Sequence, residues 1–427
     1  MNRPKRLVVG GAALVAATLA LTACGASGGD AGAGGGDPEQ LTMWARSSTQ
    51  DYTQALVDAW NADHETQIDL TIVASESFQQ KAGAAAGAGS LPDILAADVV
   101  YAPNYAKQSV FLDITDRIAE LPFADDLVDA HVEAATVDGK AYAVPHKVDS
   151  SFIFYNKDLF SRAGLDPEAP PTTYEGIREA AAAITALGDG TYGAYFPGNC
   201  AGCNAYTAFG VAKAGDEVPF TDDGATVDID NDALADWFGL YQELYADGSV
   251  APGATTGDST TQQEPFLQGK AGMWPNGSYS IPVVNETVDF EWGYMPLATA
   301  DGSGTGTFVG GDVIGISGTS PNADAAWEFI EWTLEDDAQV NIVAKAGDLP
   351  VRVDLADNEN TGADPRLVAV TEGLANGYTP STLAYGEAIN SPNGPWLTAV
   401  RGAVFDNDPD ALATGQDSIQ ALLDGAY

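Results

Sequence analysis

The sequence is poor in cysteine and in basic residues. Three of its 427 residues are cysteine, and 18 lysines and arginines stand against 61 aspartates and glutamates, which gives a net charge of −43. A surface this acidic repels nucleic acid and anionic membranes, and it favours solubility. We therefore expect no nucleic-acid partner.

Long apolar runs are also scarce. A spanning helix needs about 20 apolar residues, and no stretch after Ala23 is long and apolar enough to serve as one. The apolar run that does occur, Leu7 to Ala23, is uncharged and follows a positive start that contains Arg3, Lys5 and Arg6. This layout is typical of an export signal rather than of a folded domain.

The residues Leu21-Thr22-Ala23-Cys24 resemble the bacterial lipoprotein signal. That resemblance implies cleavage of a signal peptide (1–23), lipidation of the Cys24 thiol, and an exported protein anchored to the outer face of the cytoplasmic membrane. The alternative is an ordinary signal peptide in which Cys24 is incidental. The segment 24–38 is small and polar, so we expect it to be a flexible tether. One acyl chain binds membranes only marginally, so a stable anchor needs more than one.

The remaining cysteines, Cys200 and Cys203, lie in the stretch NCAGCN. With Cys24 lipidated, the count is even in an oxidising compartment, which favours a local disulfide that stiffens a loop. A redox Cys-x-x-Cys opens a helix in a small thioredoxin-like unit, and nothing around this pair resembles one. A zinc site needs two further ligands, and none of the three histidines is close in sequence. We expect no metal.

Strands and helices alternate through the first part of the body. Apolar or alternating runs predict strands at 41–44, 67–72 and 92–98. Helical spacing predicts one helix that begins near 48 and a second helical stretch through 82–88. This order is typical of an open, mostly parallel sheet. Further predictions are a hairpin at Asp138-Gly139, a strand at 151–155, helices at 174–187 and 233–246, and a helix that begins at Ser320-Pro321, with the serine as its cap.

Motifs for catalysis are missing from the sequence. It contains no Walker loop, no His-Glu-x-x-His helix and no credible triad, and the one Gly-x-Ser-x-Gly match lies in the predicted tether. We expect neither an enzyme nor a cofactor. An exported glycoside hydrolase is the alternative, and it would need two carboxylates about 5–10 Å apart across the sugar bond. With 61 acidic residues, such pairs arise by chance.

Five blocks of sequence carry a resemblance that covers nearly the whole mature chain. In order they read LPDILAADVVYAPNYAKQSVFLDIT, GKAYAVPHKVDSSFIFYNKDLFSRAGLDPEAPPTTYEG, FLQGKAGMWPNGSYSI, VGGDVIGISGTSPNADAAWEFIEWTL and AGDLPVR. They resemble blocks of the bacterial extracellular solute-binding protein family 1, the sugar-binding type that serves ABC importers. The resemblance implies an α/β, periplasmic-binding-protein-like fold of two discontinuous lobes with a hinge of crossing strands. The implied lobes are 39–148 with 308–350, and 149–307 with 351–427.

The resemblance also points to ligand-binding residues. A sugar packs its C–H faces on aromatic rings and offers hydroxyls to polar groups. Asp149 and Trp396 match a carboxylate and a stacking tryptophan of a maltose-binding relative, and Tyr279 falls where that relative has a second stacking ring. Trp274 and Asn276 lie in the same block as Tyr279. The alternatives are a solvated charge for Asp149 and a core position for Trp396.

Other candidates follow from their place near strand ends or lobe crossings, except Asn199, which flanks the cysteines in a loop that the resemblance places near the cleft. Strand ends are the usual place for ligand-facing loops in such sheets. These candidates are Ser47, Asp98, Tyr101, Asn199, Gly311, Asp312 and Arg352.

These features together predict a lipid-tethered receptor for an ABC importer. We expect a monomer that binds a small carbohydrate between two lobes, closes by a hinge, and delivers its ligand to the membrane permease. The alternative ligands are a polyol, a phosphorylated polyol and a peptide. A phosphate ligand would need several cations in the cleft, and removal of the signal leaves only 15 of the 18 lysines and arginines.

Overall fold

The computed structural model describes residues 40–427, and the predicted signal, Cys24 and tether lie outside the described residues. The segment Pro38–Tyr427 forms one compact unit. It begins with strands and helices in alternation, as predicted. These elements are β1 (Gln40–Arg46), α1 (Gln50–Asp63), β2 (Gln67–Val73), α2 (Ser75–Ala88) and β3 (Ile94–Asp98). Both β2 and β3 pair with β1 in parallel.

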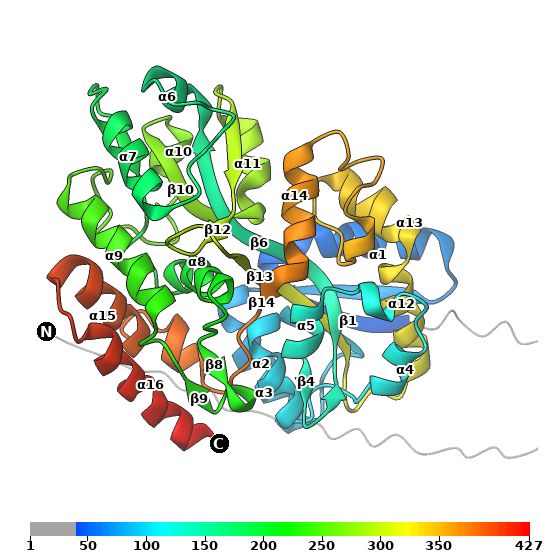
Figure 1. The fold of residues 1–427 in the computed structure, drawn as a ribbon. Coiled ribbons are helices and arrows are strands. Elements are labelled where there is room, and N and C mark those ends of the chain that lie inside the picture. The colour runs from blue at the N-terminus through cyan, green and yellow to red at the C-terminus, as the bar shows by residue number, and fades with distance from the viewer. Residues whose placement is uncertain (1–39) are drawn as a thin grey trace, which may run out of the picture. The chain divides into compact units, whose positions relative to one another are not determined.

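Two long strands join the groups of strands in a mixed ten-stranded sheet. The main order is β2-β1-β3-β13-β6-β10-β7. The first half of β6 (Val144–Asn156) pairs with β13 (Thr305–Ile316), and its second half pairs with β10 (Ala271–Gly277) and β11 (Trp292–Met295). Because β13 also pairs with β3, the strands β6 and β13 connect the β1–β3 group to the β10–β7 group (Figure 1). The order ends at β7 (Tyr192–Ala194).

The pairing of β6 with β13 contains an irregularity beside the candidate residue Asp312. The register shifts between Asp312 and Val313. The preceding residue, Gly311, has φ of 113°, and a Cβ placed there would lie 2.0 Å from the Lys147 carbonyl oxygen. Only glycine fits this close approach of two backbones.

The helix α8 (Ala201–Ala214) corrects the prediction of a loop around the two cysteines. Cys200 caps this helix, so the disulfide between Cys200 and Cys203 closes its first turn. Most residues of α8 are small or apolar and buried, and the helix contacts β13. Because it is buried on most sides, its sequence lacks the alternation of apolar and polar faces that marks a surface helix.

The other predicted elements are present, with one correction. The hairpin forms between β4 (Thr136–Val137) and β5 (Lys140–Ala141). The helix predicted to begin at Ser320 begins at Ala323 instead. The Ser320 hydroxyl donates to Asp93, and Asn322 is the residue that precedes the first turn of α12. The larger helices are α7 (Tyr174–Thr185), α9 (Asp232–Ala246), α12 (Ala323–Leu334), α14 (Pro365–Gly373), α15 (Pro395–Arg401) and α16 (Ala411–Ala426).

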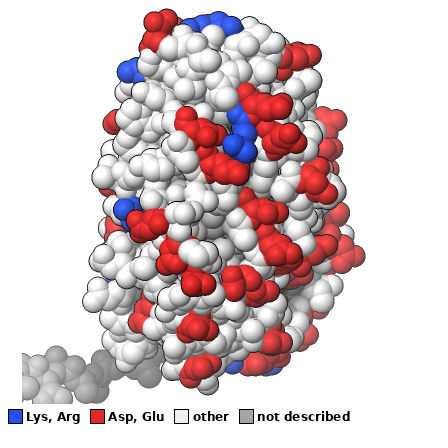
Figure 2. All heavy atoms as spheres, turned by 60° about the vertical axis from the view of Figure 1, so that its left-hand side comes forward, with Lys and Arg blue, Asp and Glu red and all other residues white. Residues whose placement is uncertain are grey.

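Short elements complete the fold. The helices are α3 (Ala102–Lys107), α4 (Thr115–Ala119), α5 (Asp129–Ala134), α6 (Lys157–Arg162), α10 (Glu264–Leu267), α11 (Ile281–Thr287) and α13 (Asp336–Ala338); the strands are β8 (Phe220–Thr221), β9 (Thr226–Val227), β12 (Leu297–Ala298) and β14 (Gly377–Tyr378). Among the described residues, no helix has the length and apolar character needed to cross a membrane. Acidic side chains far outnumber basic ones on the face drawn in Figure 2.

Candidate functional site

A cavity of about 250 Å³ lies where the strand ends meet the long strands and α8. Arg46 and Asp98 are the last residues of β1 and β3, so both side chains come from the carboxyl ends of parallel strands. Such ends are the usual place for ligand sites in open α/β sheets. The lining residues are Arg46, Asp98, Val100, Asp149, Gly202, Cys203, Tyr206, Tyr279, Phe308, Gly310, Gly311, Tyr385 and Asn390.

An ion cluster forms one wall of the cavity. The Arg46 Nη1 donates to Asp98 Oδ2 at 2.7 Å, and its Nε donates to Asp312 Oδ1 at 2.8 Å. The Thr49 hydroxyl donates to the second Asp312 oxygen at 2.8 Å. Asp312 has no exposed surface, so it supports the wall from behind. Among the residues that line the cavity, Arg46 is the only cation, and both of its carboxylate partners are within hydrogen-bond distance.

Burial and the charge of Arg46 shift the pKa values of Asp312 and Asp98 in opposite directions. Burial works to raise the pKa of Asp312, but the Arg46 charge and the hydrogen bonds from Arg46 and Thr49 outweigh it and hold the pKa below its ordinary value. Burial raises the pKa of Asp98, and the Arg46 charge offsets only part of this effect. Asp312 is therefore the firmly ionised partner of Arg46.

A second carboxyl, Asp149, lies on β6 and is held by α8. The Tyr206 hydroxyl donates to Asp149 Oδ1 at 2.5 Å. Burial raises the pKa of Asp149 to about 6, although the hydrogen bond from Tyr206 acts in the opposite direction. At neutral pH, Asp149 is thus mostly an ionised acceptor that is poorly solvated, and a hydroxyl or amine donor would stabilise it.

Aromatic rings stand beside these carboxyls. The ring centroid of Tyr206 lies 5.7 Å from that of Tyr279 and 5.2 Å from that of Phe308. Tyr279 is 45% exposed, which is unusual for a large side chain in this protein, and it lines the cavity. The cavity therefore offers a flat apolar surface next to directional polar groups.

Four of the residues predicted from the sequence line this cavity: Asp98, Asp149, Tyr279 and Gly311. Two more lie next to it. Asp312 contacts Arg46, and the Tyr101 hydroxyl accepts a hydrogen bond from the Asn390 amide at 3.4 Å.

The two predicted tryptophans lie in the core instead of the cavity, which corrects those expectations. Neither Trp274 nor Trp396 has exposed surface. Phe209 and Phe238 pack against Trp396, and its indole N–H donates to the Ala201 carbonyl oxygen at 3.0 Å. Trp396 thus supports the start of α8 from behind. Trp274 packs between phenylalanines of the β6 and α10 region in the same way.

The other four predicted residues are also absent from the lining. Arg352 is nearly buried and forms ion pairs with Asp336 and Asp354, so its charge is already matched. Ser47 lies at the surface and bonds Ser75. Asn199 is exposed on the loop before α8, and Asn276 is buried with its amide on the Ser280 hydroxyl.

Sequence reasoning missed several lining residues. Arg46 comes two residues after the predicted strand 41–44 and is the last residue of the observed strand, so its position near a strand end was a usable signal. Tyr206 lies in the helix that was not predicted. Tyr385 and Asn390 come from a segment with no predicted element, and no local signal marks them.

A second cavity of about 360 Å³ is larger but has a different character. It lies between the β4 region and the segments that carry Phe220, Tyr378 and Tyr427. Its lining contains neither the Arg46 ion cluster nor the ends of β1 and β3. We therefore assign the candidate site to the cavity beside Arg46.

Comparisons with known proteins match this chain to solute-binding proteins over most of its length. A family model described as bacterial extracellular solute-binding protein matches residues 55–369, which is more than half of the chain. The diacetylchitobiose binding protein DasA of Streptomyces coelicolor is 27% identical over 414 residues, which cover 93% of this chain and 94% of that protein.

Two further comparisons show the same breadth. A maltooligosaccharide ABC transporter solute-binding lipoprotein of Streptococcus pneumoniae is 22% identical, over 95% of this chain and 94% of that one. The crystal structure of the cyclic alpha-maltosyl-1,6-maltose binding protein of Arthrobacter globiformis superposes with a TM-score of 0.77. It is 25% identical, and the match covers 91% of this chain and all of that chain.

Proposed function

Because the chain belongs to the family of bacterial extracellular solute-binding proteins, we propose that it captures a carbohydrate in the cavity beside Arg46 and delivers it to an ABC importer permease. The observation that carries the proposal is the half-exposed Tyr279 ring beside the carboxyls of Asp149 and Asp98. A sugar needs both kinds of contact: a flat ring for its C–H face and acceptors for its hydroxyls. The names of the relatives in S. coelicolor and S. pneumoniae support a saccharide ligand.

The charges of the cavity argue against an anionic ligand. Arg46 is the only cation in the lining, and Asp98 and Asp312 already compensate its charge. A phosphate group would meet Asp149 without a free cation to balance it. This disfavours the phosphorylated polyol that the sequence left open.

The ligand site also implies a division into lobes. We propose lobes of 39–148 with 308–350, and 149–307 with 351–427, joined where β6 and β13 cross. The pairing of β6 with β13 in its first half and with β10 in its second half supports this division. Closure of the lobes over the ligand would then give the permease a shape to recognise, provided that the permease prefers the closed form.

The N-terminal residues would tether this receptor. We propose that Cys24 carries the lipid anchor at the outer face of the cytoplasmic membrane and that the receptor acts as a monomer without catalysis. The S. pneumoniae relative is named as a lipoprotein, which supports the anchor. Mass spectrometry of the mature N-terminus tests it, and an unmodified Cys24 or cleavage at another residue would exclude it.

The experiment that tests the function is thermal unfolding of a chain that begins at Gly25, which retains the compact unit Pro38–Tyr427. The panel contains mono-, di- and oligosaccharides, polyols and glycerol 3-phosphate. A ligand present at 100 times its dissociation constant stabilises the folded state by about 2.7 kcal/mol. We expect a clear rise in Tm with one or two saccharides and none with the phosphate. A flat response to every carbohydrate would refute a saccharide ligand, and hydrolysis of a glycoside would refute a purely binding function.

A further inference from the structure

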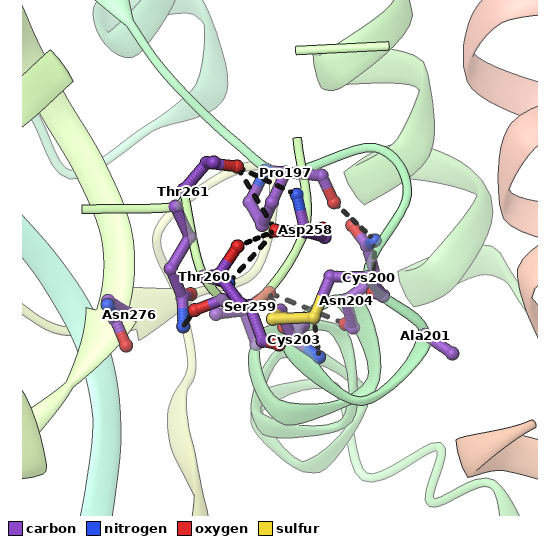
Figure 3. Close-up of a disulfide and its surroundings, with 12 residues drawn as sticks. Pro197, Cys200, Ala201, Cys203, Asn204, Asp258, Ser259, Thr260, Thr261 and Asn276 are labelled. Atoms are coloured by element: carbon purple, nitrogen blue, oxygen red, sulfur yellow. Dashed lines mark hydrogen bonds between the residues drawn. A yellow bond between two sulfur atoms is a disulfide. The ribbon is translucent and has the colours of Figure 1, made fainter. Parts of the chain in front are cut away.

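The disulfide between Cys200 and Cys203 lies at the wall of the candidate ligand cavity. Cys203 lines the cavity together with Gly202 and Tyr206, its neighbours on the first turns of α8. Cys200 is buried, whereas Cys203 is partly exposed. Figure 3 shows the Cys200–Cys203 bond at the start of α8, with the segment Asp258–Thr261 drawn near it. The bond thus joins the buried cap of the helix to a residue that faces the cavity.

The segment before the helix is held in place without the disulfide. The Asn204 amide donates to the carbonyl oxygens of Pro197 and Cys200, at 2.9 and 2.7 Å. The backbone N–H groups of Gly198 and Asn199 donate to the loop at 254–257. The disulfide closes a loop of only four residues, and short loops constrain the unfolded chain least. Its removal should therefore leave the fold intact.

The first turn of α8 is the part that depends most on the bond. The backbone N–H of Cys203 donates to the Cys200 sulfur at 3.3 Å. The same turn sets the width of the cavity, because a Cβ on Gly202 would lie 3.1 Å from the Asn390 side-chain oxygen. Four residues after Gly202, Tyr206 holds Asp149. A shift of this turn would therefore move both the cavity wall and the group that orients Asp149.

We propose that the Cys200–Cys203 disulfide is a positioning element of the ligand site, so that its reduction weakens ligand binding while the protein stays folded. The proposal rests on the carbohydrate-binding function proposed above. The step requires a dithiol reductant. The disulfide accepts two electrons and two protons and becomes two thiols, while the dithiol gives them up and becomes a cyclic disulfide. Because Cys203 is partly exposed and Cys200 is buried, we expect the incoming thiolate to attack the Cys203 sulfur.

The test compares oxidised, reduced and reoxidised protein, with dithiothreitol as the reductant, in the chain that begins at Gly25. This chain retains only Cys200 and Cys203, so thiol titration reads zero before and two after reduction. Isothermal titration calorimetry with the saccharide that raised Tm measures the Kd of each form. The titrations are run at a temperature well below the Tm of every form, so that all of them are folded. We expect Kd to rise roughly tenfold on reduction, about the loss of one well-placed contact, and to return on reoxidation. The double variant Cys200→Ser, Cys203→Ser is the matched control, and its Kd should be weak and indifferent to the reductant.

Hydrogen exchange provides a readout that needs no ligand. Reduction should speed exchange of the amides of residues 202–206 and leave the rest of the chain unchanged. An unchanged Kd, or loss of binding only together with global unfolding, would overturn the proposal. If no saccharide binds the oxidised protein, the proposed function fails, and the exchange measurement still decides whether the bond holds the first turn. Unchanged exchange at 202–206 would then overturn the positioning role by itself.

Discussion

The Arg46 guanidinium donates to the carboxylate of Asp312, although 266 residues separate them in the chain. Their contact ties the end of β1 to the irregular point of β13, and Asp98 at the end of β3 completes the cluster. The cluster thus holds three strands together behind one wall of the candidate site. Because Asp98 and Asp312 already neutralise Arg46, the one cation of the cavity lining is not free to bind an anionic ligand.

Substitution of Arg46 by methionine should destabilise the protein strongly. Asp312 has no exposed surface, and loss of Arg46 would leave its charge buried without a partner. Breaking a buried pair in this way costs about 3–5 kcal/mol. Urea unfolding at pH 7 would measure the loss. The matched control is Arg117→Met, because its partner Asp324 is 94% exposed and the loss should stay below about 1 kcal/mol. Equal losses in the two variants would contradict a buried, charge-bearing role for Arg46.

Substitution of Asp149 by asparagine should change how stability depends on pH. Burial raises the pKa of Asp149 to about 6, whereas a carboxyl in an unfolded chain titrates near 4. Since the folded state favours the protonated form, its stabilisation is complete below about pH 4 and is lost as the pH rises through 6. Asp149→Asn should remove this decline and gain on the order of 1–2 kcal/mol at pH 8 relative to pH 4, since partial exposure reduces the full effect. Urea unfolding between pH 4 and 8 gives the free energy of unfolding of both proteins as a function of pH. If the two curves run parallel, the pKa of Asp149 is not raised.

The elements that the sequence predicts well are those whose signal is local. The strands β1 to β3 alternate with helices, and the hairpin turn at Asp138-Gly139 has a turn chemistry that needs no distant partner. The helix α8 was missed because it is buried on most sides and lacks an amphipathic period. The first half of β6 was missed for a different reason, since its sequence VPHKVD contains a proline and three polar residues and lacks the apolar run of a buried strand.

The candidate site is predictable only in part, because a motif fixes the order of residues but not the direction of a side chain. Asp149 and Tyr279 face the cavity, as the resemblance implied. Trp396 occupies a matching place in the chain, yet Phe209 and Phe238 enclose its ring. These partners lie more than 150 residues earlier, so no local pattern around Trp396 reports the enclosure.

Substitution of Gly311 by alanine should destabilise the pairing of β6 with β13. The residue has φ of 113°, and a Cβ there would lie 2.0 Å from the Lys147 carbonyl oxygen, so the backbone would have to move. We expect a loss on the order of 2–3 kcal/mol in urea unfolding, from backbone strain and the clash. Gly239→Ala is the control, because this helical glycine has nothing within 4 Å of its Cβ position and alanine should gain about 0.5–1 kcal/mol. A neutral Gly311→Ala would show that the two strands can separate locally at no cost.

Alanine substitution of Tyr279 should weaken ligand binding, whereas alanine substitution of Trp396 should lower stability. Tyr279 is 45% exposed and lines the cavity, so Tyr279→Ala should remove about 1–3 kcal/mol of ring contact and leave Tm nearly unchanged. This loss corresponds to saccharide binding weakened roughly 5- to 150-fold. Trp396 is fully buried, so Trp396→Ala should lower the free energy of unfolding by about 3–5 kcal/mol. Calorimetric titration and urea unfolding measure the two effects.

The control for Tyr279→Ala is Tyr245→Ala, because Tyr245 is 42% exposed but lies against Phe405, outside the lining of the cavity. It should leave both Kd and Tm close to those of the original protein. If Tyr245→Ala weakens binding as much as Tyr279→Ala, the ligand does not lie against the exposed Tyr279 ring. If Trp396→Ala leaves stability intact but abolishes binding, the tryptophan turns outward in the liganded protein, and the sequence resemblance describes that state better than the enclosed ring does.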